Sequence, residues 1–395
     1  MGSILNFVSL FTENNRPEWC FRGPLTDYIL NNYKHSVGID FDNTLNNIIV
    51  LETHEHYKGT YRNLKTEFLG TSLVDLLKNN NVKILFGSIA DPTSRIDKIK
   101  LQNQIELFNL TDKVYYADSV INHIDDKNTF CYHHFLEEPG VHYKTHGNYN
   151  FFETKNDLGY KSKDINENEL DGFRNKKFLS FNRTVDKDNR LSLYHTFLEN
   201  NFSDSYFSFL NFSSTYPSDM AGIPFFTKTP KLSYDEYISK LPIELDTKNT
   251  NINLKNFRTS NTFKKDLFLN SCINIVTETS FASNSIFISE KIIKPIISYQ
   301  PFLVLGPYHY LKELKRLGYK TFSDFWDEGY DEIENGAERY FALEKIILEL
   351  NNKTIEELNE LYQKTKNICI YNRKVFDNFR QNSIPQIIKQ IENEW

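Results

Sequence analysis

Several features that would assign this chain to a common protein class are missing from its sequence. It has only four cysteines in 395 residues, none in a C-x-x-C spacing: Cys20, Cys131, Cys272 and Cys369. This argues against a zinc knuckle or a dithiol redox centre, and scattered free thiols suit a reducing compartment. No apolar run approaches the ~20 residues that cross a bilayer. The N-terminal segment lacks the basic start and cleavage site of a signal peptide, so we expect a cytoplasmic protein.

A strong charge of one sign is also missing. The formal net charge is −6, which gives no overall attraction to nucleic acid, so we do not expect a nucleic-acid partner. Internal repeats and low-complexity tracts are absent, and 39% hydrophobic with 25% charged residues is typical of a globular protein. At 395 residues the chain is longer than one ordinary core, which predicts more than one domain.

The first part of the chain alternates between strand-like and helix-like segments. Val82–Gly87 (VKILFG) and Val114–Ala117 (VYYA) are short apolar runs typical of buried strands. Between them, Asp91-Pro-Thr-Ser begins a helix whose proline suits the first turn. This alternation predicts a parallel sheet of the Rossmann type. We place that domain at residues 1–170.

The stretch Ile273–Gly306 predicts a second α/β unit. Ile273–Thr277 is a buried strand, Ser289–Ser298 a helix, and Pro301–Leu305 another strand. Ligands of α/β folds gather where strand ends meet helix starts. We therefore expect a second Rossmann-like, nucleotide-sugar-binding domain at residues 171–350. Amphipathic helices over 351–395 are expected to pack back across both domains.

Charged residues gather where the Ser289 helix begins. Glu290, Lys291 and Lys294 lie within its first turns, and the N–H groups of a helix N-terminus favour anions. The pattern predicts that the lysines bind the phosphates of a nucleotide-sugar and that Glu290 accepts hydrogen bonds from its ribose. The alternative is an ordinary ion pair between Glu290 and Lys294 on a solvated helix.

Two further positions complete the expected donor site, and a third is open. Lys291 and Arg190 would neutralise the departing diphosphate, with Arg183 as another cation. Both arginines could instead form surface pairs with Asp186 and Asp188. Glu278 follows the Ile273–Thr277 strand and is a candidate for the same cleft.

Two blocks of the sequence resemble a known group of enzymes. Lys177–Leu198 (KFLSFNRTVDKDNRLSLYHTFL) and Thr277–Asp331 (with FISEK, KPI and QPF) are similar to viral and bacterial glycosyltransferases. More distantly, they resemble the nucleotide-binding half of the α-1,3-fucosyltransferases. Those carry a strand ending in Ser-Asn, a later arginine, and then (Ile/Val)-(Ser/Thr)-Glu-Lys. Ser180-Phe-Asn182, Arg190 and Ile288-Ser-Glu-Lys291 follow that order here.

The resemblance covers the C-terminal half of the chain and implies a GT-B architecture, in which two Rossmann-like domains face each other across a cleft. It implies transfer of a sugar from a nucleotide-diphosphate-sugar to an acceptor glycan, with inversion and with no required metal or other cofactor. It also implies a donor contact for Asn182, which could instead cap the following turn. Lys294-Pro295 stands where fucosyltransferases carry Asn-Ala, so the donor sugar is left open.

The catalytic base of such a transfer is expected at a strand end of the N-terminal domain, as a carboxylate or histidine. The main candidates are Asp40, Asp42 and His54. Glu52, His56 and Asp91 are further ones.

Asp40-Phe-Asp-Asn-Thr-Leu45 permits a different interpretation. It matches the first motif of haloacid-dehalogenase-like phosphatases, with Asp40 as nucleophile, Asp42 as acid/base and Mg²⁺ as cofactor. Ser88 and Lys98 fit two later motifs, and the last acidic motif fits poorly. The alternatives are therefore a phosphatase fused to a sugar-nucleotide module, a transferase acting on modified DNA, and a non-catalytic glycan-binding protein.

Overall fold

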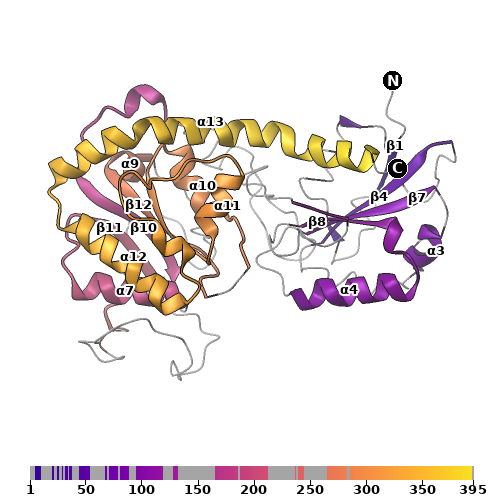
Figure 1. Ribbon diagram of the computed structural model, residues 1–395, viewed down its shortest axis with the longest axis horizontal. Helices are drawn as coiled ribbons and strands as arrows, with labels where there is room; N and C mark the ends of the chain where they lie inside the picture. The colour runs from indigo at the N-terminus through magenta and orange to yellow at the C-terminus, as the bar shows by residue number, and fades with distance from the viewer. Residues whose placement is uncertain are drawn as a thin grey trace. The chain divides into compact units, whose positions relative to one another are not determined.

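The computed structural model divides the chain into two compact units, each built on its own sheet (Figure 1). One unit is Met1–Glu153 with Asn378–Trp395, and the other is Thr154–Asp377. Both sheets are parallel and are connected through helices, which confirms the α/β class and is compatible with Rossmann-like domains. The structure describes residues 5–9, 20–21, 25, 29, 32–33, 35–37, 44–53, 67–68, 71–78, 81–88, 95–118, 128–131, 165–185, 187–211, 236, 239–243, 265–282 and 285–393.

The sheet of the first unit has the order β3-β1-β4-β7-β8-β9, and all these neighbours are parallel. The strands are β1 (Leu5–Ser9), β3 (His35–Val37), β4 (Asn46–Thr53), β7 (Val82–Ser88), β8 (Val114–Asp118) and β9 (Thr129–Cys131). A short strand, β2 (Cys20–Phe21), pairs antiparallel with the end of β4. The two-residue strands β5 (Glu67–Phe68) and β6 (Thr71–Ser72) form a separate hairpin. The expected strands over 82–87 and 114–117 are confirmed, whereas the sequence analysis does not predict β1 or β4.

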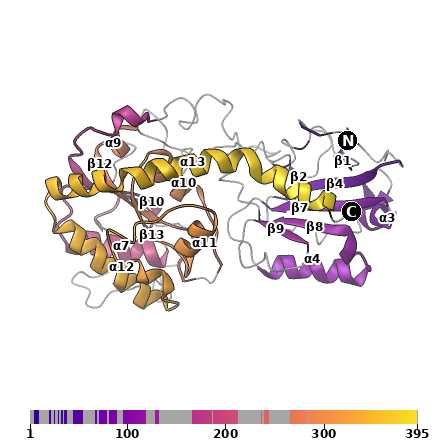
Figure 2. The same ribbon diagram turned by 45° about the horizontal axis from the view of Figure 1, so that its top comes forward.

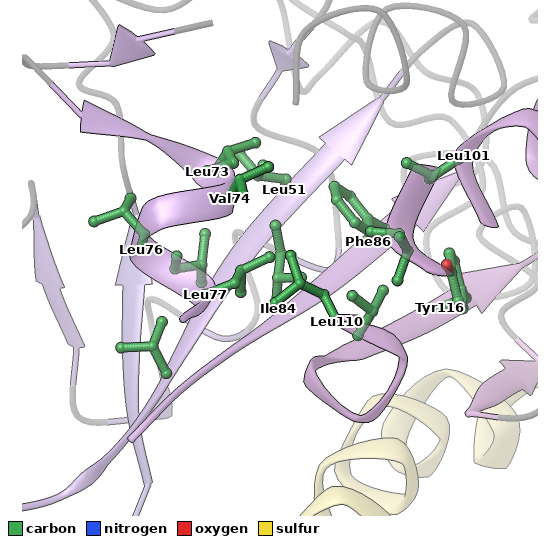
Figure 3. Packing of buried hydrophobic residues seen from close by; sticks show 14 of the residues in the cluster. Leu51, Leu73, Val74, Leu76, Leu77, Ile84, Phe86, Leu101, Leu110 and Tyr116 are labelled. Carbon is green, nitrogen blue, oxygen red and sulfur yellow. The ribbon is translucent and has the colours of Figure 1, made fainter. Parts of the chain in front are cut away.

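Alternation along β4 divides the core of this unit into two layers. Ile49 and Leu51 pack on one face, under α3 (Leu73–Leu77) and α4 (Arg95–Leu107), as Figure 3 shows for Leu51. Ile48 and Val50 point to the other face, which the last turns of helix α13 cover. Successive side chains of a strand point to opposite faces, so both faces of β4 are apolar because both are covered.

The second unit has the sheet order β11-β10-β12-β13, again with parallel neighbours. Its strands are β10 (Lys176–Thr184), β11 (Tyr206–Asn211), β12 (Ser271–Thr277) and β13 (Phe302–Leu305). Every residue of β12 and β13 is buried, as expected for central strands with helices on both sides. The expected strands over 273–277 and 301–305 are confirmed.

The helices of the second unit pack around this sheet (Figure 2). They are α7 (Asp188–Glu199), α9 (Lys265–Leu269), α10 (Glu290–Ile297), α11 (Tyr310–Arg316), α12 (Gly336–Asn351) and α13 (Ile355–Asn393). Short 3₁₀ turns are η1 (Thr111–Lys113) in the first unit, and η3 (Glu167–Glu169) and η7 (Gly329–Glu332) in the second. Thr196 of α7 bonds to the Tyr340 hydroxyl of α12 at 2.7 Å. Arg373 of α13 donates to the carbonyl of Ile297, at the end of α10.

The C-terminal region is one helix, although its sequence suggests two, over 355–378 and 385–394. Pro385 lies inside α13, where it removes one backbone hydrogen bond. Ile384, Ile387 and Ile388 beside it are buried in the core of the first unit, and this apolar burial offsets the lost bond. None of the helices in the described part of the chain has the length and apolar character needed to cross a bilayer.

Candidate functional site

The strand order of the second unit reverses between β10 and β12. From β10 the chain moves outward to β11, and it then returns to build β12 and β13 on the opposite side. Such a reversal is the point where open α/β sheets bind ligands, outside the carboxyl ends of the strands. Helix α7 begins shortly after β10 ends, and α10 is the helix that follows β12. Both helix starts therefore belong to this edge of the sheet.

A buried hydrogen bond joins the two strands at this point. The Thr277 hydroxyl, at the end of β12, donates to Asn182 Oδ1 in β10 at 2.6 Å. Asn182 in turn donates through Nδ2 to the Ser180 hydroxyl at 3.2 Å. Asn182 is almost fully buried, so in this structure its side chain organises the strand ends. Its expected contact with a donor stays a prediction.

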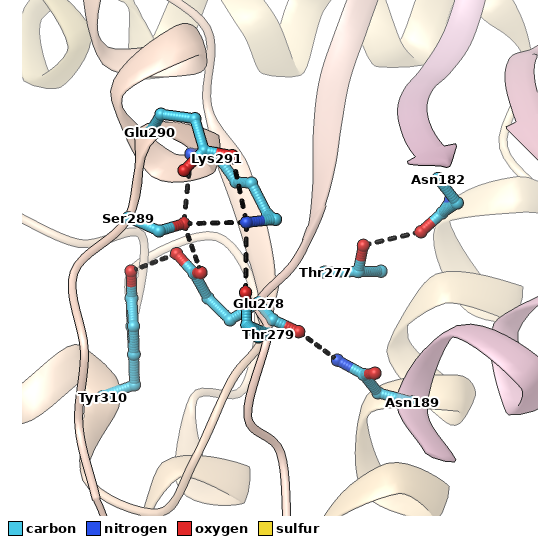
Figure 4. Close-up of polar contacts among 9 residues, drawn as sticks. All are labelled: Asn182, Asn189, Thr277, Glu278, Thr279, Ser289, Glu290, Lys291 and Tyr310. Carbon is cyan, nitrogen blue, oxygen red and sulfur yellow. Dashed lines mark hydrogen bonds and ion pairs between the residues drawn. The ribbon is translucent and has the colours of Figure 1, made fainter. Parts of the chain in front are cut away.

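Glu278 lies directly after β12 and is fully enclosed by protein (Figure 4). The Ser289 hydroxyl donates to its Oε2 at 2.5 Å, and the Tyr310 hydroxyl donates to its Oε1 at 2.6 Å. Its carboxyl group thereby connects the end of β12 to the starts of α10 and α11. Ser289 is the N-cap of α10, and its hydroxyl also accepts the backbone N–H of Lys291 at 3.3 Å.

The Lys291 amine lies at the centre of the remaining contacts. Its Nζ is 3.2 Å from Thr279 Oγ1, 3.2 Å from Ser289 Oγ and 3.1 Å from Glu290 Oε1. The Lys291 side chain keeps 23% of its surface exposed and that of Glu290 keeps 13%. The first turn of α10 thus presents a partly accessible ammonium group next to a carboxylate.

The two glutamates of this cluster differ in protonation behaviour. Burial raises the pKa of Glu278 above its ordinary value, although Lys291 and the hydrogen bonds from Ser289 and Tyr310 act in the opposite direction. Burial acts in the same way on Glu290, but there Lys291 and Lys294 outweigh it and hold its pKa below the ordinary value. Glu290 is therefore the anion that faces the lysines.

The other expected cations differ in their surroundings. Lys294 is buried, with its amine 5.5 Å from the centre of the Phe181 ring and near enough to Glu290 to lower the pKa of that carboxyl group. Arg190 lies in the first turn of α7 and is largely buried. Arg183 belongs to β10, but its side chain lies outside the described residues, as do the catalytic candidates Asp40, Asp42 and His54.

Two residues of the cluster are missed by sequence reasoning. Tyr310 and Asn189 contact Glu278 from positions 32 and 89 residues away in sequence. For Tyr310 one signal exists in Gly306, where a Cβ would lie 3.0 Å from the tyrosine ring. For Asn189 we find no sequence signal. Within the described residues, no group of three or more His, Cys, Asp and Glu side chains is placed to hold a metal ion.

Comparison with known proteins adds no family to this picture. No family model, curated protein or solved structure matches the chain significantly. The function is therefore inferred from the chemistry of the site.

Proposed function

We propose that the protein is a glycosyltransferase that binds a nucleotide-sugar where α10 begins. The observation that carries this proposal is the Lys291 amine, partly exposed beside Glu290 at a helix start and at the reversal of strand order. Helix N-termini bind phosphate through their N–H groups, and a lysine adds positive charge. A diphosphate with an attached ribose matches this pairing of a cation with an acid.

Each group of the cluster has a role in the proposed reaction. Lys291 and the first N–H groups of α10 bind the diphosphate, and Glu290 accepts hydrogen bonds from the ribose hydroxyls. The diphosphate gains negative charge as it leaves, so a cation held beside it stabilises the transition state more than the bound donor. Arg190 and Lys294 contribute further positive charge to this part of the unit.

The transfer itself exchanges one bond for another. An acceptor hydroxyl forms a bond to the anomeric carbon while the bond from that carbon to the diphosphate oxygen breaks. The diphosphate leaves with the electron pair, and a base accepts the hydroxyl proton. We propose that Asp40, Asp42 or His54 is this base, in an inverting enzyme of GT-B architecture whose acceptor is a glycan.

The phosphatase alternative finds less support in the strand order. Asp40 and Asp42 follow β3, whereas Ser88 ends β7, and β1 and β4 lie between those two strands. A phosphatase site needs its nucleophile and its phosphate-binding hydroxyl close together. A transferase acting on modified DNA differs only in the acceptor and remains a second possibility for the same donor site.

Incubation with a panel of nucleotide-sugars tests the proposal. The matching donor should raise the unfolding temperature, since a ligand at 100 times its Kd adds about 2.7 kcal/mol of stability. With that donor, the protein should slowly release nucleoside diphosphate by hydrolysis. If no nucleotide-sugar binds and an Asp40-dependent phosphatase activity is found, the transferase proposal is wrong.

A further inference from the structure

The cluster at the start of α10 depends on the connection between β12 and α10. This connection brings Glu278 and Ser289, which are 11 positions apart in sequence, to 2.5 Å from each other. Phe281, Phe287 and Ile288 within it are buried. Residues of α7 and α12 hold two of its backbone carbonyl groups in place.

Arg339, in α12, holds the first of these groups. Its guanidinium is 1% exposed and donates through Nη2 to the carbonyl of Phe281. Nη1 donates to the carbonyls of Ile333 and Glu334 at 2.6 and 2.9 Å. The guanidinium also lies over the Phe281 ring, 4.5 Å from its centre. One buried cation therefore fixes both the backbone and the side chain of Phe281 against the turn that precedes α12.

Asn189, in the first turn of α7, holds the second group. Its Nδ2 donates to the carbonyls of Glu278 and Leu305, both at 3.0 Å, and thereby joins the ends of β12 and β13. The neighbouring Asp188 reinforces this attachment. The Ala282 amide and Arg339 both lower the pKa of its carboxyl group, although burial raises that pKa overall.

We propose that Arg339 and Asn189 are positioning residues for the anion site at the start of α10. Neither would touch the ligand. Together they fix the carbonyls of Phe281 and Glu278, so that Glu278 meets Ser289 and Ser289 meets the Lys291 amine. This inference rests on the proposed function for its ligand, and on the contacts above for its geometry.

The chain supplies a matched control for Arg339. Arg174 is also 1% exposed, donates to the carbonyls of Phe268 and Ser271, and lies over the Tyr362 ring at 3.6 Å. Ser271 is the first residue of β12, so Arg174 holds the end of that strand away from Glu278. Arg339→Lys and Arg174→Lys each remove a stacked, carbonyl-binding guanidinium and keep the charge. Only the first lies next to the candidate site.

Two measurements on the full chain, both well below the unfolding temperature, test the inference. Backbone hydrogen exchange without ligand should speed up over residues 278–291 in Arg339→Lys and Asn189→Ala, but not in Arg174→Lys. Titration with inorganic pyrophosphate and with GDP or UDP should show a loss of affinity of about tenfold in the first two variants only.

The possible outcomes separate this inference from the proposed function. Unchanged exchange over 278–291 in folded Arg339→Lys and Asn189→Ala would overturn the positioning role. Equal losses of affinity in Arg339→Lys and Arg174→Lys would also overturn it, because they would reflect general destabilisation. If the unmutated protein binds none of the probes, the proposed function fails, and the exchange data alone decide whether these residues hold the connection.

Discussion

Thr277 donates a hydrogen bond to Asn182 across 2.6 Å, and this bond joins the carboxyl ends of β12 and β10 where the strand order reverses. Both residues are almost fully buried. Glu278, the next residue after Thr277, connects to α10 through Ser289 and to α11 through Tyr310. The bond therefore fixes the strand end from which the candidate site is built.

Removing the Thr277 hydroxyl should destabilise the protein. Thr277→Val keeps the shape of the side chain but leaves Asn182 Oδ1 without its 2.6 Å donor in a buried place. We expect a loss of about 1–3 kcal/mol in unfolding free energy, measured by urea denaturation. Thr277→Ser, which keeps the hydroxyl, should lose less. Equal stability of the two variants would contradict the importance of this bond.

Removing the Lys291 amine should abolish nucleotide binding. In Lys291→Met the side chain keeps its length but has no charge for the diphosphate, so the thermal shift caused by GDP or UDP should disappear. Lys366→Met is the matched control, because Lys366 is also partly exposed and paired with a carboxylate, that of Asp171. A thermal shift that persists in Lys291→Met would show that the phosphate binds elsewhere.

Glu278 should make stability depend on pH. Because burial raises its pKa above the ordinary value of 4.5, the folded protein holds this proton more tightly than the unfolded chain does. The contribution of Glu278 to stability is therefore greatest at low pH and falls as the pH rises from about 4.5 through the raised pKa. Glu278→Gln stays uncharged and should gain stability relative to the unmutated protein between about pH 5 and pH 8.

Urea denaturation across this pH range provides the comparison, and Glu360→Gln, at an exposed position of α13, controls for the loss of a surface carboxylate. A constant difference between Glu278→Gln and the unmutated protein at every pH would show that the proton on Glu278 is not held more tightly after folding.

The first unit contains a buried ion pair that should be sensitive to mutation. Lys98 Nζ of α4 lies 3.4 Å from Asp118 Oδ2 at the end of β8 and 3.0 Å from Thr129 Oγ1. Lys98→Met leaves the Asp118 carboxylate buried without this cation, which should cost about 3–5 kcal/mol in urea denaturation. Lys98→Met combined with Asp118→Asn should recover much of that loss. A single variant as stable as the double one would contradict this account.

Local patterns predicted much of the second unit. The apolar runs of β12 and β13 have the right length for strands, and Ser289 before Glu290 is a recognisable N-cap, which the structure confirms. Gly318, expected to end α11, has a φ of 92°, a conformation that favours glycine. These features depend on neighbours in sequence, so they can be read without knowledge of the fold.

Long-range contacts could not be predicted in the same way. Tyr310, Asn189 and Arg339 reach the candidate site from three different helices, and no local pattern in the sequence indicates which residues they will meet. Strand β4 was also missed, because its first residues, Asn46 and Asn47, are polar. Asn47 is nevertheless buried, since its side-chain oxygen accepts a hydrogen bond from Asn6 at 2.8 Å.

The most direct test of the central claim is to locate a bound nucleoside diphosphate in crystals soaked with GDP or UDP. We expect phosphate oxygens within hydrogen-bond distance, about 2.7–3.2 Å, of Lys291 Nζ and the first N–H groups of α10, with the ribose beside Glu290. A diphosphate bound at another place, with Lys291 still paired only with Glu290, Ser289 and Thr279, would contradict the proposed site.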